Sequence, residues 1–382
     1  MKISVKPNLS FTAKVKDLQS AIQKVLSITS FVDCLDTEKQ IAMIVSEGKA
    51  HIAGITPDAF ACVTIETSSA SKDGALMFDP VLVQGLIKGR DELTVTGDKS
   101  NLVMTAVKGK YTATTEIVLL ETADTMRIEQ VFETTKAKKL KADVIAAIRA
   151  GIKAAELTNF YSDEVILAYV KIGKNGVNIE CADNFHVSRY QDKTKSSVTM
   201  KFAIPTKTFS LIDRFIGDTD AQFALDGQQL RVSGKGFVVS LPETQVDPEM
   251  FDLVPTYLET LKNPQTTLKF NPEAMKTVEN MFAIITDDTR MAFSVGEKSV
   301  KVNMTTKSGS VSDAFKAFIT GATRTVHIDP RIFNDLFKKL SGKEIPMEFF
   351  GDQKKGSSAC FRLVSQPSKS ARLTQIGTFY DE

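Results

Sequence analysis

Few residues of this chain have the type and spacing that catalysis or metal binding requires. The three histidines are far apart and form no short spacing such as HxxxH, which would place two ligands on one metal ion; they are His51, His186 and His327. Acidic pairs such as Asp33 with Asp36 lie in loop-like segments, where solvated turn residues are the simpler interpretation. The sequence contains no GxSxG elbow, no phosphate-binding loop and no GxGxxG motif. We therefore expect no enzymatic activity, no catalytic residue, no metal site and no cofactor.

Basic residues, by contrast, recur on one face of each of six predicted helices. In each helix apolar residues follow the helical period, and the opposite face carries Lys or Arg. One such face is in general only a solvated surface, but six faces in equivalent repeat positions can form a single wall that binds phosphates without reading bases. These faces hold few aromatic residues, which favours duplex DNA over stacked single strands. The residues predicted to face DNA are Lys16, Lys24, Lys88, Arg149, Lys153, Lys207, Arg214, Lys276, Arg331 and Lys338.

The elements that must position these residues form an internal repeat. A strand-like run leads to Pro80, Pro205 and Pro330, which are 125 residues apart in both intervals, and an amphipathic helix follows each proline. Proline fixes φ and lacks an N–H, so it suits the first turn of a helix. A second strand and helix begin each copy, with helices predicted at Asp17–Thr29, Asp143–Glu156 and Pro272–Ile285.

This repeat predicts an α+β protein of three tandem domains, each made of two similar halves. The expected boundaries are 1–131, 132–257 and 258–382. Two segments without a clear period, Glu121–Phe132 and Glu243–Pro264, are predicted to be linkers. The helix that follows Pro80 is expected to bury Leu82, Val83, Leu86 and Ile87.

The composition restricts the class of protein and its compartment but does not identify a binding partner. The 382 residues include 48 Lys and Arg against 46 Asp and Glu. The four cysteines are scattered without a CxxC pattern, which suits a reducing compartment. The N-terminal segment alternates like a strand and lacks a signal-peptide core, and no apolar run is long enough for a membrane span. We expect a soluble, intracellular protein that does not associate with a membrane.

The repeats resemble the bacterial β sliding clamp, the processivity factor of DNA polymerase. CADNFHVSRY at Cys181–Tyr190 is similar to the family's strand and turn ATDGHRLA, and DPEMFDLVP at Asp247–Pro255 is similar to its FPDYRRVLP. Val326–Leu340 resembles the matching strand and helix of the third domain, and the organisation agrees over essentially the whole chain. Two segments depart from the family: Asn184–Val187 replaces Gly-His-Arg-Leu, and the tail IGTFYDE replaces MPMRL. Net charge is also close to zero where such clamps are commonly acidic, and a divergent clamp, for example a viral one, would account for these differences.

The resemblance implies a ring with its sheets outside and two helices per domain lining the inside. Six domains make a ring in this family, so three domains per chain imply a head-to-tail homodimer. Such a ring encloses double-stranded DNA without sequence preference, tethers a DNA polymerase and is opened by a clamp loader. It acts in the cytoplasm, at the nucleoid or at a viral replication site.

The resemblance also implies two sets of contact residues. At the dimer interface, Ile284 and Ile285 would contact Tyr111 and Ala113 of the partner, with Ile284 as the better candidate because it lies off the apolar helix face. A pocket for a partner peptide would be formed by Asn184, Phe185, His186, Val187, Pro255, Ile332, Ile376, Thr378 and Phe379. The changed residues at 184–187 lead us to expect a peptide preference unlike that of the usual bacterial partners.

A different class of protein is the main alternative. An enzyme or a structural assembly protein built on triplicated domains could hold a site between its repeats. Such a protein should carry a cluster of polar residues of catalytic type near one linker, and the sequence shows no such cluster. A stable dimer that is retained on nicked circular DNA and lost from linear DNA would favour the clamp.

Overall fold

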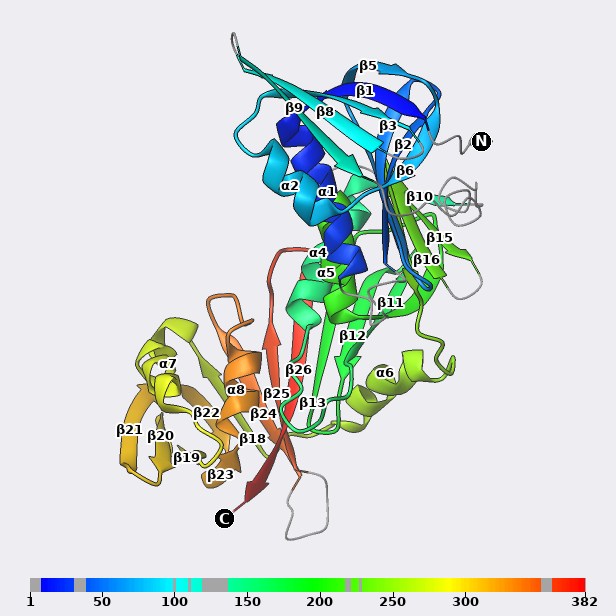
Figure 1. The fold of residues 1–382 in the computed structure, drawn as a ribbon. Coiled ribbons are helices and arrows are strands. Elements are labelled where there is room, and N and C mark those ends of the chain that lie inside the picture. Colours follow the sequence, from blue (N-terminus) through cyan, green and yellow to red (C-terminus); the bar gives the residue numbers. More distant parts are fainter. Residues whose placement is uncertain are drawn as a thin grey trace. The chain divides into compact units, whose positions relative to one another are not determined.

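The computed structural model describes residues 8–30, 39–98, 101–108, 111–118, 137–216, 221–226, 229–351 and 359–381. Antiparallel sheets and short helices alternate along the chain, so the predicted α+β class is confirmed (Figure 1). The chain forms two compact units, one made of Met1–Ala142 with Lys207–Glu243 and the other of Asp143–Thr206 with Thr244–Glu382. The predicted linker Glu121–Phe132 lies outside the described residues.

The first unit contains two sheets. The strand order is β5-β1-β7-β8-β9 in the five-stranded sheet and β10-β15-β16-β17-β4-β3-β2-β6 in the eight-stranded sheet. The elements are β1 Leu9–Lys14, α1 Val15–Thr29, β2 Gln40–Ser46, β3 Lys49–Ile55, β4 Phe60–Ile65, β5 Thr67–Ser71, β6 Gly74–Met77, α2 Pro80–Ile87, β7 Glu92–Gly97, β8 Asn101–Lys108, β9 Tyr111–Val118, β10 Lys138–Leu140, α5 Thr206–Ile216, β15 Ala221–Asp226, β16 Gln229–Gly234 and β17 Phe237–Pro242.

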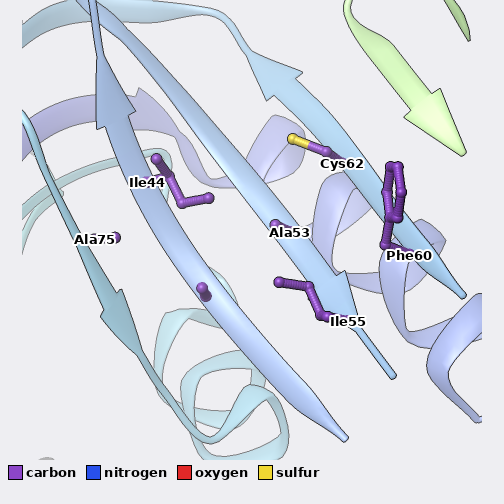
Figure 2. Close-up of a cluster of buried hydrophobic side chains, with 7 residues drawn as sticks. Ile44, Ala53, Ile55, Phe60, Cys62 and Ala75 are labelled. Carbon is purple, nitrogen blue, oxygen red and sulfur yellow. The ribbon is translucent and has the colours of Figure 1, made fainter. Parts of the chain in front are cut away.

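Strands β2 and β3 of the eight-stranded sheet are buried on both faces. On one face α1 packs closely on β3, because a Cβ at Gly54 would lie 2.3 Å from the Cγ1 atom of Val25. The neighbouring Ala53 points to the opposite face, since side chains alternate along a strand. There it joins a buried cluster that includes Ile44 and Cys62 (Figure 2). Burial on both faces explains why β2 and β3 are apolar almost throughout.

The second unit is built around a 13-stranded sheet. Its main order is β14-β11-β12-β13-β26-β23-β19-β20-β21, with β18, β22, β24 and β25 attached beside that path. The elements are α4 Ala142–Ala155, β11 Leu167–Gly173, β12 Gly176–Ala182, β13 His186–Asp192, β14 Met200–Pro205, α6 Met250–Thr260, β18 Thr266–Phe270, η2 Pro272–Met275, α7 Lys276–Met281, η3 Phe282–Ile284, β19 Arg290–Val295, β20 Ser299–Thr306, β21 Gly309–Lys316, β22 Phe318–Gly321, β23 Arg324–Ile328, α8 Pro330–Phe337, β24 Ile345–Phe350, β25 Cys360–Ser365 and β26 Ala371–Asp381.

Two strand pairings link the predicted domains within these units. Strand β17 pairs with β4, and strand β13 pairs with β26. Residues of the predicted middle domain therefore share one sheet with the predicted first domain and another with the predicted third domain. The division into three domains and the arrangement of sheets and helices around a ring remain predictions.

The junction around the repeated proline has the same structure in the first and third copies but not in the middle copy. Pro80 and Pro330 are the first residues of α2 and α8, and the carboxylates of Asp79 and Asp329 cap these helices by accepting backbone N–H bonds. In the middle copy Pro205 instead ends β14, and α5 begins one residue later. The residue before this proline is Ile204, whose apolar side chain offers no capping oxygen.

Three expectations about the helices are wrong. Helix α2 buries Val83 and Ile87 but leaves Leu82 exposed by 45% and Leu86 by 37%, because its two turns contact the protein along one narrow stripe. The segment predicted as one helix over Pro272–Ile285 is divided into η2, α7 and η3. The segment Glu243–Pro264 is more than a linker, since it contains α6, whose internal proline obscures the helical pattern.

No helix in the described ranges is long and apolar enough to cross a membrane. Cys62, Cys181 and Cys360 are buried free thiols, which agrees with the absence of a pairing pattern in the sequence. Burial raises the pKa of the Cys62 thiol to about 12, so this thiol is protonated at neutral pH.

Candidate functional site

The turn between β12 and β13 is held by the carboxylate of Asp183. Its Oδ1 atom accepts the backbone N–H groups of Phe185 and His186, at 2.7 and 2.8 Å. The same oxygen lies 2.7 Å from Nδ1 of the His186 ring. An aspartate that bonds to its own turn in this way fixes the backbone. Asn184 and Phe185 at the tip of the turn are therefore presented to solvent in a defined position.

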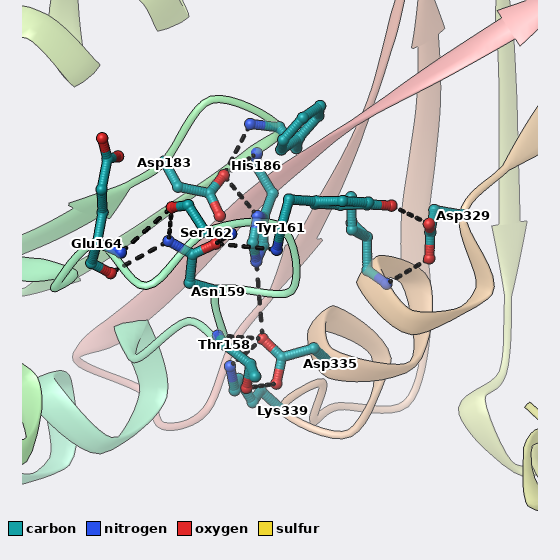
Figure 3. A network of polar contacts seen from close by, with 12 residues as sticks. Thr158, Asn159, Tyr161, Ser162, Glu164, Asp183, His186, Asp329, Asp335 and Lys339 are labelled. Atoms are coloured by element: carbon teal, nitrogen blue, oxygen red, sulfur yellow. Dashed lines mark hydrogen bonds and ion pairs between the residues drawn. The ribbon is translucent and has the colours of Figure 1, made fainter. Parts of the chain in front are cut away.

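The His186 side chain joins this turn to helix α8. It is buried, and its Nε2 atom lies 3.9 Å from a carboxylate oxygen of Asp335 (Figure 3). Burial opposes the charged form, but the carboxylates of Asp183 and Asp335 outweigh it and raise the pKa of His186. Burial would also raise the pKa of Asp335, yet its interactions with the nearby His186 ring and with the charged, hydrogen-bonded Lys339 hold it at about 2. Thr158 donates two further hydrogen bonds to Asp335, which attaches the segment after α4 to the same group.

The segment between α4 and β11 is shaped by Asn159. The Oδ1 atom of Asn159 accepts the backbone N–H groups of Tyr161 and Ser162, while its Nδ2 atom donates to the Ser162 hydroxyl and to the Glu164 carbonyl (Figure 3). All the polar atoms of this amide are thus used within the segment. The segment in turn presents Val165 to solvent.

An aromatic pair lies beside the turn. The rings of Tyr161 and Phe185 are 4.4 Å apart, and both side chains are partly exposed. The guanidinium of Arg331 lies 4.9 Å from the Tyr161 ring centroid and forms ion pairs with Asp329 and Asp287. The Tyr161 hydroxyl donates to Asp329, and burial together with that carboxylate raises the pKa of Tyr161 to about 12.

Helix α6 forms the other side of the site. Its Pro255 has no N–H to donate to the Phe251 carbonyl, and Nζ of Lys171 donates to that carbonyl instead. This hydrogen bond from β11 fixes the helix on the sheet in spite of the proline. Met250 and Leu253 remain exposed on one side of α6.

A pocket of about 220 Å³ lies between these segments. Its floor and walls are mostly apolar, and four polar residues border it. The lining residues are Asn159, Glu164, Val165, Ile166, Tyr169, Ala182, Asp183, Asn184, Met250, Leu253 and Val254. A concave, mostly apolar site with a few fixed polar groups is the usual form of a ligand pocket.

The nine residues predicted for a peptide pocket occupy several environments. Asn184 lines the pocket, Phe185 and Thr378 are exposed, and Val187 and Pro255 are partly buried. Four are buried: His186, Ile332, Ile376 and Phe379.

The structure does bring several of these nine residues together. In the pairing of β13 with β26, Val187 is opposite Ile376, and the Thr378 N–H donates to the Phe185 carbonyl. Both Val187 and Ile376 pack in a cluster with Tyr257 and other residues of α6. The tail thus lies directly beside the turn that presents Asn184.

The pocket contains exposed apolar residues that the sequence analysis did not select. Val165, Met250 and Leu253 all line it. The three-residue spacing of Met250 and Leu253 is a helical signal, but Pro255 argued against a helix there. Val165 lies just before β11, which begins at Leu167, so its exposure is not set by a strand period.

The residues predicted to face DNA differ in how accessible they are. Lys24 is partly buried over the Phe215 ring, Arg149 is partly buried, and Arg331 is held in the ion pairs described above. Lys276 is exposed but pairs with Glu273 at 2.5 Å. The exposed cations are Lys16, Lys88, Lys153, Lys207, Arg214, Lys276 and Lys338.

Of the residues predicted for a dimer interface whose side chains are described, Ile284 is exposed, by 42%, and Ile285 and Ala113 are partly buried. Tyr111 and Ala113 belong to β9, which is an edge strand of the five-stranded sheet, and the Tyr111 side chain lies outside the described part. Strand β21, at the end of the 13-stranded sheet, is a second exposed edge.

Within the described ranges, no group of three or more His, Cys, Asp or Glu side chains is arranged to hold a metal ion. His186 lies between the carboxylates of Asp183 and Asp335, and this arrangement favours the protonated form of its own ring.

The chain is similar to known proteins in its fold but not detectably in its sequence. No family model matches the chain, and no curated protein sequence matches it. Solved structures, however, match it over nearly its whole length. The DNA polymerase III beta chain of Streptococcus pneumoniae is 13% identical with a TM-score of 0.78, and the match covers 98% of this chain and 100% of that chain.

Two further structures agree, with the same coverage. The DNA polymerase sliding clamp of Bacillus subtilis is 14% identical with a TM-score of 0.75. The DNA polymerase III beta subunit of Thermotoga maritima is 11% identical with a TM-score of 0.74. The chain therefore has the fold of these bacterial β subunits, as the sequence resemblance implied.

Proposed function

We propose that this chain, which has the β sliding clamp fold over 98% of its length, is itself a DNA sliding clamp without enzymatic activity. The observation that carries the proposal is the match of the complete fold, since a likeness of one domain would be compatible with many functions. The ring would be a head-to-tail homodimer around double-stranded DNA. A polymerase would be tethered to it, and a separate loader would open it.

The DNA contacts would come from the basic helix faces. The exposed cations on α1, α4 and α5, together with Lys338 directly after α8, carry this part of the proposal. Arg331 contributes less because Asp287 and Asp329 already neutralise it. Such contacts act through counterion release and read no sequence. They would allow the ring to slide.

The dimer contact would join two surfaces that leave apolar side chains exposed. One is the end of the first helix of the third repeat, with Ile284. The other combines the β9 edge with the exposed face of α2, where Val81 and Leu82 project. Two different surfaces that meet head to tail form a closed ring if the rotation between subunits is right.

The tether would be the pocket beside the β12–β13 turn. It has room for one apolar side chain, and α6 and the tail strand support its walls. A short peptide of the polymerase would dock there. The chain would act in the cytoplasm, at the nucleoid or at a viral replication site.

The test is topological. Protein assembled on nicked circular DNA should stay bound, and cutting that DNA to a linear form should release the protein, because a ring slides off a free end. Light scattering should give the mass of two chains, and negative-stain images should show a closed ring. Equal retention on circular and linear DNA would contradict the clamp function.

A further inference from the structure

The polar groups that border the pocket are hydrogen-bond acceptors more than donors. Glu164 and Asp183 contribute carboxylates, and the lining residues include no Lys or Arg. Asn159 borders the pocket too, but its amide atoms are already bonded within its own segment. The pocket therefore offers a ligand two carboxylates and the side chain of Asn184.

One oxygen of Asp183 lacks a partner. The side chain is only 8% exposed, and its Oδ1 atom accepts all three bonds of the turn. The Oδ2 atom has no hydrogen-bond donor among the described residues. A buried acceptor without a donor costs free energy, so a ligand that supplies one gains affinity.

The Glu164 carboxylate is exposed and extends away from the polar network (Figure 3). Its backbone is fixed, because its carbonyl accepts from Asn159 and its N–H donates to the Ser162 hydroxyl. No ion pair involves the side chain within the described ranges. The carboxylate is thus held at the pocket border and available to a ligand.

Nearby cations do not cancel this charge. Lys171, under α6, is paired with Glu180 and Asp252. His186 is paired with Asp183, so that carboxylate is already compensated, and Lys339 is paired with Asp335. The Glu164 carboxylate has no such cation partner among the described residues. The pKa of Asp183 is lowered, since hydrogen bonds from His186 and the backbone outweigh the effect of burial, so its carboxylate is ionised at neutral pH.

We infer that the pocket binds a peptide segment in which one apolar side chain is flanked by Lys or Arg. The inference rests on the proposed function, because it specifies the ligand of the proposed tether. The apolar side chain contacts Val165, Met250 and Leu253, which are exposed without it. The basic group lies at the Glu164 carboxylate. A peptide with an acidic residue at this position places like charges together, which weakens its binding.

A randomised nonapeptide library displayed on phage tests the inference with the full-length protein. The variant Leu253→Asp, which puts a charge on the apolar wall, serves for counter-selection. Peptides that bind the wild-type protein and not the variant should be enriched in an apolar residue with Lys or Arg beside it. A synthetic peptide of the selected sequence then provides a probe for fluorescence anisotropy.

Two neighbouring acids provide a matched pair of variants. Glu164→Gln should weaken binding of the synthetic peptide by about threefold, the size typical of one exposed charge pair, and this loss should shrink in high salt. Asp163→Asn removes an exposed carboxylate one residue away that does not line the pocket, so it should change affinity much less. Replacing the peptide's Lys with Glu should reduce binding further.

The possible failures are distinct. Selected peptides that share an apolar residue without a basic neighbour, or that carry acidic neighbours, would overturn the charge preference and leave the pocket as a peptide site. A library that gives no enrichment over Leu253→Asp would overturn the pocket itself. Neither result bears on retention of the ring on circular DNA, which tests the clamp function separately.

Discussion

At the scale of single residues, two buried histidines have opposite electrostatic environments. His186 lies between Asp183 and Asp335, which raise its pKa above the ordinary value. His51 accepts or donates one bond to the Thr64 hydroxyl, and burial together with the charge of Lys49 lowers its pKa to about 4. The two carboxylates therefore favour the charged form of the His186 ring, whereas burial keeps the His51 ring neutral.

Replacing His186 by Gln should destabilise the second unit in a pH-dependent way. A group whose pKa is raised by folding stabilises the folded state fully below its unfolded pKa and loses that contribution as pH rises through its folded value. The loss caused by His186→Gln should thus be larger at pH 6, about 1–3 kcal/mol for a broken buried charged hydrogen bond, than at pH 9. Thermal midpoints of wild type and variant at both pH values measure the difference.

His51→Gln is the matched control. Because the folded state keeps this ring neutral, the wild-type protein loses stability as pH falls below the ordinary histidine pKa, and the variant does not. The cost of His51→Gln should therefore be smaller at pH 6 than at pH 9. The same pH trend in both variants would show that the charge of His186 does not hold the turn.

At the scale of elements, β26 belongs both to the candidate site and to the core. It pairs with β13, β25 and β23, so it crosses much of the second unit. Its Ile376 packs against residues of α6. Its Phe379 is 3% exposed, with the Phe349 ring 5.7 Å away and the Arg324 guanidinium 4.9 Å away.

The variant Phe379→Ala should lower the stability of the second unit by about 3–5 kcal/mol, the usual cost of removing a buried aromatic side chain. The neighbouring Thr378→Ala changes an exposed side chain and should stay within about 0.5 kcal/mol of wild type. Thermal or chemical unfolding compares the two. Because Phe379 is core, truncation of the tail would test stability as much as peptide binding, and point variants such as Leu253→Asp separate the two.

Helix α2 has an apolar face that the described residues leave exposed. Val81 is exposed by 72%, and Leu82 and Leu86 lie beside it. A surface of this kind on a short helix suggests an interface with another protein chain. We assign it to ring closure together with Ile284.

Leu82→Asp and Ile284→Asp should each give folded monomers, because both put a charge on a surface that is exposed in the single chain and would be buried in the proposed dimer. Light scattering measures the mass, and circular dichroism shows that the fold is kept. Leu253→Asp, an equally exposed position on α6, should leave the dimer intact. A dimer that survives both interface variants would place the contact elsewhere.

At the scale of the whole molecule, the positive charge on the helix faces is distributed and not concentrated. The exposed cations lie on different helices, and the formal net charge of the chain is only +2. Binding through such a surface is a sum of weak contacts. Each contact releases counterions, so the affinity falls as salt is added.

Neutralising four exposed cations together should weaken retention on circular DNA with little change in thermal midpoint or dimer mass. The set is Lys153→Ala, Lys207→Ala, Arg214→Ala and Lys338→Ala. The slope of log affinity against log salt should fall by roughly 0.9 for each phosphate contact that is lost. The control removes exposed cations away from the helices: Lys174→Ala, Lys301→Ala and Lys369→Ala. If the two sets of variants had equal effects, the helix faces would not be the surface that contacts DNA.

The sequence by itself determined the local features of the fold. The proline repeat at Pro80, Pro205 and Pro330 located three strand–helix junctions, and the apolar period located α1, α4 and α8. These features depend on residues close together in the chain, and backbone propensity together with one apolar face is enough to specify them.

The tertiary structure decided what these elements contact. His186 meets Asp335 only because β13 pairs with β26 and α8 packs nearby, and no local pattern encodes that pairing. In the same way, Leu82 satisfies the helical period but remains exposed. The pocket depends on Val165 and Leu253, which come from segments far apart in the sequence. A helical or strand period shows which face can be buried, whereas the packing of remote segments determines which face is buried and which remains free to bind.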